Sequence, residues 1–310
     1  MLKKIILTIV ITVFILKLVE LGAEWSIARF PETKTNYISQ KKFDGIKILY
    51  HGACEVEWVV NPGYLDSVIG LKSYNLATGN SNFADNYLDL HIYLKKQQKP
   101  DYVILQVSPE SFEARNNNLK VFNYANFFDD TTVVNVLNEG DKRYMSTTFI
   151  PFLKFSFYSN FTLFRVLAGF LYGIANVQDP RFVNGYRPPD GFDQFLFGSL
   201  LEKKNNFKWS SYEEKYLIKI IELCKTQNIK LVFFRVPTYL PYQRINPILA
   251  EKNKLIEQIA SDHNVPYFSY DNLEMNNDSS NFFNIHNMST KGSKKFLKIF
   301  ANQLKDSIFK

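Results

Sequence analysis

A cysteine and a histidine far apart in this chain are the residue types of an acyl-transfer site. Cys54 lies in KILYHGACEVEW at 47–58, where a short apolar run ends in a turn of small residues. His286 lies in IHNMSTKGSKKF at 285–296, just before a segment with helical spacing. A nucleophile on a strand-to-helix turn, with a distant histidine as base, is typical of enzymes that attack acyl groups. The sequence therefore predicts that Cys54 is the nucleophile if the fold brings it to His286. Otherwise Cys54 is a small core residue.

Charged residues near Cys54 have two interpretations each. Glu55 and Glu57 follow the cysteine, where they would bind a polar substrate or raise the pKa of the thiol. His51 precedes Gly52, and strand alternation directs it away from its neighbours, so we expect a structural role. Arg235 ends a predicted strand, where it would meet an anionic polymer or form a surface salt bridge.

The predicted elements place Cys54 at one edge of a parallel sheet. Three apolar runs predict strands, and two segments with helical spacing predict the helices between them: 45–50, 73–76 and 102–107, then 64–71 and 82–98. Strands and helices that alternate at this spacing indicate an α/β fold. Asn75, at the end of the second strand, is expected to tie loops together.

The same pattern returns in the last third of the chain. Ser211 and Glu214 form a predicted capping box at the start of a helix. Further elements follow in the order helix, strand, helix, strand, helix: 211–227, 229–236, 245–263, 266–270 and 290–309. The two α/β parts therefore flank a large helical and aromatic insertion, residues 108–209. Its apolar part, 149–177, either packs on the core domain or forms a lid or membrane-facing surface beside the site.

The N-terminus has the pattern of a membrane anchor. Lys3 and Lys4 precede an apolar run at 5–16, and Lys17 is followed by more apolar residues. We expect an uncleaved signal anchor at 1–23, with a cleaved signal peptide or a buried helix as alternatives. The positive-inside rule then places the rest of the chain outside the cytoplasm, beyond a polar linker at 24–44.

Composition limits the partners and cofactors. The formal charge is +7, but it comes from scattered lysines, so nucleic acid binding is not expected. No cysteine and histidine cluster has zinc spacing, and we expect no metal and no cofactor. The chain has two cysteines; Cys224 lies in an amphipathic pattern typical of a core helix.

Four segments in this order resemble the motifs of the SGNH/GDSL hydrolase-like superfamily: GAC at 52–54, YNLATGNS at 74–81, YVILQV at 102–107 and HNMSTKG at 286–292. The chain is most similar to membrane-anchored members that act with membrane-bound O-acyltransferases on cell-envelope polymers, as in alginate O-acetylation and teichoic acid D-alanylation. The resemblance covers the core and implies a flavodoxin-like three-layer parallel sheet for an SGNH-like domain at 45–310. NGYRP at 184–188 resembles a segment often found in the insertion.

The resemblance also implies site roles. Cys54 stands where the family has its serine, and a thiolate is the stronger nucleophile. His286 matches the catalytic base. Gly79 and Asn80 match the oxyanion positions, where glycine permits close approach of the backbone. An ordinary turn is the alternative for this pair, because Gly-Asn is common in turns.

The third catalytic residue of the family is missing. Phe283 stands at the aspartate position, three residues before His286. Asn284 is then expected to orient the imidazole, as an asparagine does in papain-like proteases, and Asp278 is a second candidate. Departures at two catalytic positions also fit a site that has lost activity.

Two main hypotheses follow. In the first, Cys54 accepts an acyl group, expected to be acetyl, and His286 moves the proton while the group passes to a cell-envelope polysaccharide or to water. A membrane-bound O-acyltransferase would be the partner. In the second, the protein is an inactive scaffold of the same fold that binds a glycan or such a partner. A thiol-dependent esterase without a membrane partner is a third alternative.

Overall fold

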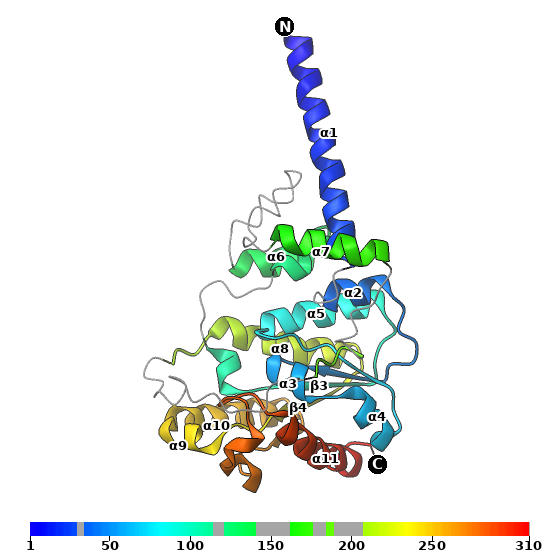
Figure 1. The fold of residues 1–310 in the computed structure, drawn as a ribbon. Helices are drawn as coiled ribbons and strands as arrows, with labels where there is room; N and C mark the ends of the chain where they lie inside the picture. Colours follow the sequence, from blue (N-terminus) through cyan, green and yellow to red (C-terminus); the bar gives the residue numbers. More distant parts are fainter. Residues whose placement is uncertain (30–33, 114–120, 141–161, 176–183, 189–206, 310) are drawn as a thin grey trace. The chain divides into compact units, whose positions relative to one another are not determined.

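The computed structural model describes residues 1–29, 34–113, 121–140, 162–175, 184–188 and 207–309 (Figure 1). The chain forms two compact units, which we describe separately. Unit 1 consists of Met1–Lys42, Lys95–Gln97 and Asn117–Asp179. Unit 2 consists of Phe43–Leu94, Gln98–Asn116 and Pro180–Lys310.

Unit 2 is built around a parallel sheet of five strands. The strands are β1 (Ile48–His51), β2 (Ser73–Asn75), β3 (Tyr102–Gln106), β4 (Lys230–Arg235) and β5 (Tyr267–Ser269). Their order is β2-β1-β3-β4-β5, and every neighbouring pair is parallel. The predicted α/β fold with a parallel sheet is therefore confirmed. Because all strands run the same way, their carboxyl ends meet at one edge of the sheet.

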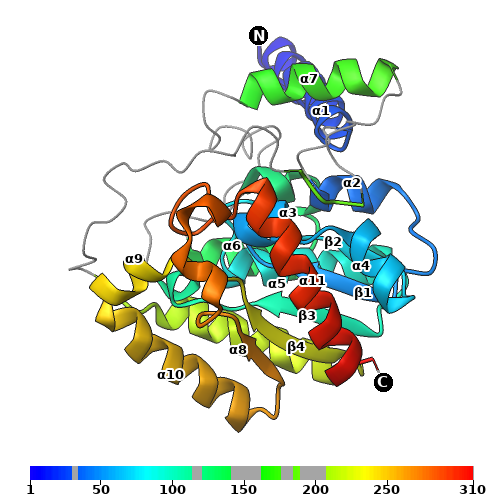
Figure 2. The same cartoon turned by 60° about the horizontal axis from the view of Figure 1, so that its bottom comes forward.

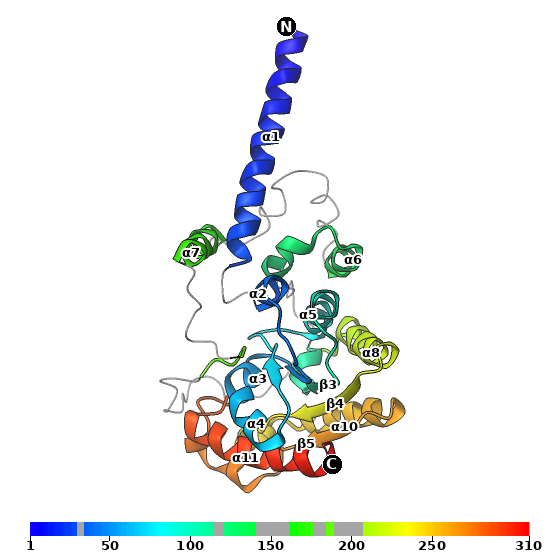
Figure 3. The same cartoon turned by 90° about the vertical axis from the view of Figure 1, so that its right-hand side faces the viewer.

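Helices cover both faces of this sheet. The helices of unit 2 are α3 (Cys54–Val59), α4 (Pro62–Ile69), α5 (Phe83–Lys96), α8 (Ser211–Thr226), α9 (Leu240–Ile245), α10 (Pro247–Asp262) and α11 (Thr290–Ser307). Short 3-10 turns add η1 (Pro109–Phe112), η6 (Glu274–Asn277) and η7 (Ser279–Asn281). Figures 2 and 3 show α3, α4 and α11 on one face and α5 and α8 on the other. The predicted helix 245–263 corresponds to α10, which begins at Pro247, and the short helix α9 before it was not predicted.

Aromatic packing holds α11 against the sheet. Phe300 is fully buried and lies on Phe234 of β4, with 4.8 Å between the ring centroids. It also contacts Tyr50 of β1 at 6.2 Å. Phe296 stacks on Phe300 one turn earlier, at 5.4 Å. Alternate strand residues such as Phe233 are also buried, so both faces of the sheet are covered, as a parallel sheet requires.

The start of α8 differs from the prediction by one residue. Ser210, not Ser211, is the N-cap, and its Oγ accepts a hydrogen bond from the Glu213 N–H at 3.3 Å. The carboxylate of Glu213 is buried and accepts from the N–H groups of Phe83 and Ala84, at 3.0 and 3.3 Å. The predicted box of Ser211 and Glu214 is therefore wrong, because Ser210 is the N-cap and the Glu214 carboxylate accepts the Trp209 Nε1–H at 2.7 Å.

Unit 1 contains α1 (Leu2–Ile27), α2 (Lys34–Gln40), η2 (Val121–Phe127), α6 (Thr131–Gly140) and α7 (Thr162–Ala175). Within the described residues, α1 is the one helix long and apolar enough to cross a membrane, and a signal sequence would have the same properties. The predicted linker 24–44 differs from a polar stalk, because it contains the end of α1 and the partly buried helix α2.

Most of the predicted insertion 108–209 lies outside the described residues. Within it, Asn117–Asp179 belongs to unit 1, and of the apolar stretch 149–177 the structure describes α7. Its two ends meet in unit 2, where Glu113 and Trp209 form an antiparallel bridge. Trp209 also stacks on Phe112, with 4.0 Å between the ring centroids.

Candidate functional site

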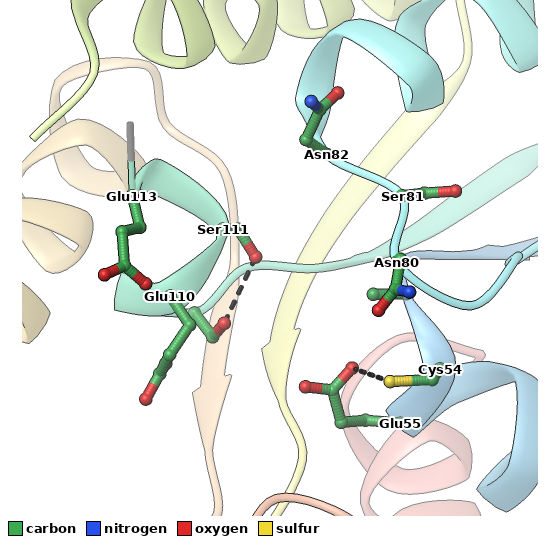
Figure 4. A pocket seen from close by; sticks show the side chains of 10 residues that line it. Cys54, Glu55, Asn80, Ser81, Asn82, Glu110, Ser111 and Glu113 are labelled. Carbon is green, nitrogen blue, oxygen red and sulfur yellow. Dashed lines mark hydrogen bonds between the residues drawn. The ribbon is translucent and has the colours of Figure 1, made fainter. Parts of the chain in front are cut away.

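A small polar hollow lies where β1, β2 and β3 end. Its volume is about 50 Å³, enough for a few water molecules or one small group (Figure 4). The lining residues are mainly carboxylates, amides and hydroxyls: Ala53, Cys54, Glu55, Asn80, Ser81, Asn82, Ser108, Glu110, Ser111 and Glu113. The chain order reverses between β1 and β3, and parallel α/β sheets bind their ligands at such a reversal.

A glycine turn brings Cys54 to this hollow. Gly52 has a φ of +150°, and a Cβ there would lie 2.8 Å from Gln106 and Val56 side-chain atoms. Gln106 at the end of β3 accepts the Ala53 N–H through Oε1 at 3.2 Å. The chain then enters α3, whose first residue is Cys54. The predicted position of the cysteine, on a tight turn at the carboxyl end of β1, is confirmed.

The thiol of Cys54 is not activated in this arrangement. Burial raises its pKa well above the usual range, and the charge of Glu55 raises it further. The thiol donates a hydrogen bond to Glu55 Oε2 at 3.5 Å, which favours the protonated form (Figure 4). The Asn80 backbone N–H acts in the opposite direction but is outweighed. Cys54 is therefore a neutral thiol at physiological pH.

Replacing Glu55 with glutamine is expected to make Cys54 more reactive. The variant loses the negative charge beside the sulfur, so the pKa of the thiol falls and the thiolate fraction rises. A fall of about one pKa unit gives about tenfold faster alkylation by iodoacetamide near pH 8. Peptide mass spectrometry measures the rate at Cys54 separately from Cys224. Glu113→Gln is the matched control: it removes a carboxylate from the same hollow, but not the one bonded to the thiol. An unchanged or slower rate in Glu55→Gln would contradict this account.

The predicted oxyanion turn lies beside Cys54, but one donor is engaged. The Gly79 N–H donates to Glu57 Oε2 at 2.7 Å, and the Glu57 side chain is buried. A Cβ at Gly79 would lie 3.6 Å from Cys54 Cβ, so the two backbones do approach closely. Asn80 has a φ of +58° and lines the hollow with Cys54. Of the predicted donors, the structure leaves Asn80 at the hollow and directs Gly79 to a carboxylate.

His286 and Asn284 lie in the turn before α11. The His286 ring is edge-on to Tyr242, with 5.2 Å between the ring centroids, and it is not among the residues that line the hollow. Asn284 Oδ1 accepts the backbone N–H groups of His286 and Asn287, at 3.0 and 2.8 Å. The structure therefore groups His286 with Asn284 and Tyr242, and groups Cys54 with other residues. A direct meeting of Cys54 and His286 stays a prediction.

Local structure accounts for much of the HNMSTKG motif. Ser289 is the N-cap of α11, and its Oγ accepts the Gly292 N–H at 3.2 Å. A Cβ at Gly292 would overlap the carbonyl of Asn281, so only glycine fits there. Asp278, the second candidate for orienting the histidine, accepts the Ser280 N–H at 2.9 Å, and its bonds to Ser280 lower its pKa. The motif therefore begins a helix that packs tightly on the preceding turn.

The acidic side of the hollow escaped the sequence analysis. Ser108, Glu110, Ser111 and Glu113 follow β3 and line the hollow. Figure 4 shows Glu110, Ser111 and Glu113 across the hollow from Cys54. They lie in and around η1, which lacks a helical or alternating pattern. Their position directly after β3 could have indicated them, because the residues after β3 lie beside those after β1 when the two parallel strands pair.

Three other predictions are tested by burial and contacts in unit 2. Asn75 is fully buried and donates to the carbonyls of Val56 and Val60, at 2.9 and 2.8 Å, so its role in tying loops is confirmed. Arg235 is 1% exposed and pairs with Asp271, with 2.8 Å between Nη1 and Oδ2. The predicted surface salt bridge or polymer contact of Arg235 is therefore wrong, because the strand end is covered. His51 is also buried, in agreement with a structural role.

Comparison with known proteins does not assign this chain to a family. No family model matches this chain, and no curated protein matches it.

Proposed function

We propose that this protein is a membrane-anchored, extracytoplasmic SGNH-like domain that binds a hydroxyl-rich ligand, such as a cell-envelope polysaccharide, without transferring an acyl group. The observation that carries this proposal is the Cys54 thiol, which donates a hydrogen bond to Glu55 inside a hollow of carboxylates, amides and hydroxyls. The strand order supports the SGNH-like assignment, since flavodoxin-like sheets have the same order.

The lining of the hollow favours hydroxyl recognition. Carboxylates accept hydrogen bonds from sugar hydroxyls, and amide and hydroxyl side chains both accept and donate them. Glu55, Glu110 and Glu113 also make the hollow acidic. Their charges repel an anionic polymer and attract an amine. The expected ligand is therefore a neutral or amino sugar whose edge, one hydroxyl or hydroxymethyl group, enters the hollow.

Acyl transfer through Cys54 is the second candidate function. It is favoured by the position of Cys54 at the reversal of strand order, beside Asn80. In this reaction the sulfur attacks an ester carbonyl, the alcohol leaves with the thiol proton, and the thioester passes its acyl group to a sugar hydroxyl or water. The thiol proton needs a base, and Glu55 is the group that contacts it, while His286 would have to approach from its own turn.

One set of measurements separates these functions. The full chain in detergent is titrated by calorimetry with a neutral glucan oligosaccharide, a glucosamine oligosaccharide and, as the anionic comparison, an alginate oligosaccharide. We expect binding of a neutral or amino sugar and none of alginate. Cys54→Ala should retain binding, whereas Ser111→Trp, which fills the hollow, should abolish it.

The same preparations are tested for hydrolysis of p-nitrophenyl acetate and for acylation of Cys54 by mass spectrometry. Neither is expected for the binding function. Turnover that disappears in Cys54→Ala would overturn the proposal in favour of acyl transfer. Equal binding by Ser111→Trp would show that the hollow is not the binding site.

A further inference from the structure

Helix α7 in unit 1 has an exposed apolar face. Leu167, Phe170, Leu171 and Ile174 are 55%, 48%, 67% and 65% exposed. Their spacing of three, one and three residues puts all four side chains on one side of the helix. A stripe of large apolar side chains at this exposure, on one face of a regular helix, is unusual for a surface that faces water only.

The opposite side of α7 packs against the end of α1. Gly169 is buried there, and a Cβ at this position would overlap the carbonyl of Ser26. Ser26 Oγ donates to the carbonyl of Val166. Phe170, at the edge of the exposed face, also meets the Trp25 ring edge-on, with 6.0 Å between centroids. Figures 1 and 3 show that α7 lies across the end of α1 instead of continuing along it.

The contact with α7 falls where α1 would leave a bilayer. At about 1.5 Å per residue, residues 2–21 of α1 span about 30 Å, which is the thickness of the hydrocarbon core. Side chains along this stretch are almost all exposed and mostly apolar. Trp25 lies about one helical turn beyond this stretch, and the Arg29 guanidinium lies over its ring at 4.0 Å from the centroid. Tryptophan and arginine at the end of a span are typical of the headgroup level.

We propose that α7 is an interfacial helix, and that the lipid bilayer crossed by α1 covers its face of Leu167, Phe170, Leu171 and Ile174. The contact of Phe170 with Trp25 makes this face continuous with the apolar surface of α1. An amphipathic helix at this level lies in the plane of the interface with its apolar side chains in the headgroup and acyl boundary. The inference depends on α1 being a membrane anchor and is independent of the function of the Cys54 hollow.

Photocrosslinking of the full chain tests this placement. A benzophenone amino acid replaces Leu171 in α7, and the protein is reconstituted in vesicles of equal parts phosphatidylcholine and phosphatidylglycerol. After irradiation, mass spectrometry identifies what is attached at the site. The same residue in place of Ile9 of α1 is the positive control for lipid contact, and in place of the exposed Glu257 of α10 it is the control for a polar surface.

We expect lipid adducts at positions 171 and 9 and their absence at 257. Adducts at 9 without adducts at 171 would overturn the proposal while keeping the anchor. Crosslinks from 171 to a second protein copy would overturn it in favour of a protein interface. Absence of lipid adducts at both 171 and 9 would contradict both the membrane anchor and the interfacial placement of α7. It would leave the results at the Cys54 hollow unaffected.

A second measurement uses charged substitutions on the same face of α7. With the benzophenone in place of Ile174, the added substitutions Leu167→Asp and Leu171→Asp should abolish the lipid adduct, because the charged face leaves the interface. Both leucines are more than half exposed, so circular dichroism and thermal unfolding should be unchanged. Retention of the lipid adduct in this variant would overturn the proposal.

Discussion

Replacing Asp271 with alanine is expected to lower the free energy of unfolding by about 3–5 kcal/mol, because it leaves a buried arginine without its carboxylate. Arg235 ends β4 and is 1% exposed, and its Nη1 lies 2.8 Å from Asp271 Oδ2. Burial raises the pKa of the Asp271 carboxyl, and Arg235 acts against that rise. A guanidinium does not lose its proton in a protein, so the unpaired charge in the variant is permanent.

Urea denaturation followed by circular dichroism measures this loss. Asp278→Ala is the matched control: Asp278 also pairs with a cation, Lys291, at 3.7 Å, but both side chains are about half exposed. Exposed ion pairs contribute about 0–1 kcal/mol, and the bond from the Ser280 N–H to Asp278 adds about 1 kcal/mol. The control should therefore lose less than Asp271→Ala. The double variant Arg235→Met, Asp271→Leu removes both charges and should recover most of the stability. Equal losses in Asp271→Ala and Asp278→Ala would refute a buried pair at the end of β4.

Replacing Asn75 with alanine is expected to cost about 2–4 kcal/mol and to loosen the Cys54 site, because three buried hydrogen bonds are lost together. The Asn75 amide donates to Val56 O and Val60 O in and after α3, and its Oδ1 accepts the Ala77 N–H at 3.0 Å. The side chain is fully buried, so water cannot replace these partners. It ties the helix that begins at Cys54 to the turn that carries Asn80.

Two readouts test the role of Asn75. The free energy of unfolding is compared with Asn61→Ala, an asparagine that caps α4 through a single bond to the Tyr64 N–H at 3.3 Å and should cost about 1 kcal/mol. The alkylation rate of Cys54 should rise in Asn75→Ala, since the thiol becomes more accessible, and should stay unchanged in Asn61→Ala. A loss no larger than that of Asn61→Ala, with an unchanged alkylation rate, would contradict a positioning role.

The parallel sheet could be predicted from the sequence because its signals are local. Runs such as YVILQV at 102–107 are apolar on both faces, which is typical of a strand covered from two sides. The capping box failed by one residue, because Ser210 and Ser211 are both good caps. Only tertiary packing decided between them, since the Glu213 carboxylate is taken by the start of α5.

Only part of the candidate site could be predicted from the sequence. The turn at Cys54 follows from Gly52 and a strand end, and both are visible in KILYHGAC. The carboxylates of Glu110 and Glu113 come from after another strand, and they join Cys54 only because β1 and β3 are neighbours. The state of the thiol depends on these neighbours and on burial, neither of which is encoded near Cys54 alone.

By itself, the sequence determined an apolar N-terminal helix, an α/β pattern and a cysteine on a glycine turn, because propensity, periodicity and turn chemistry act over a few residues. The tertiary structure decided that Arg235 is buried with Asp271, that the Gly79 N–H is bonded to Glu57, and that the Cys54 thiol stays protonated. Burial and charge act through space, so the partners of each group emerge only when strands distant in the chain are brought side by side.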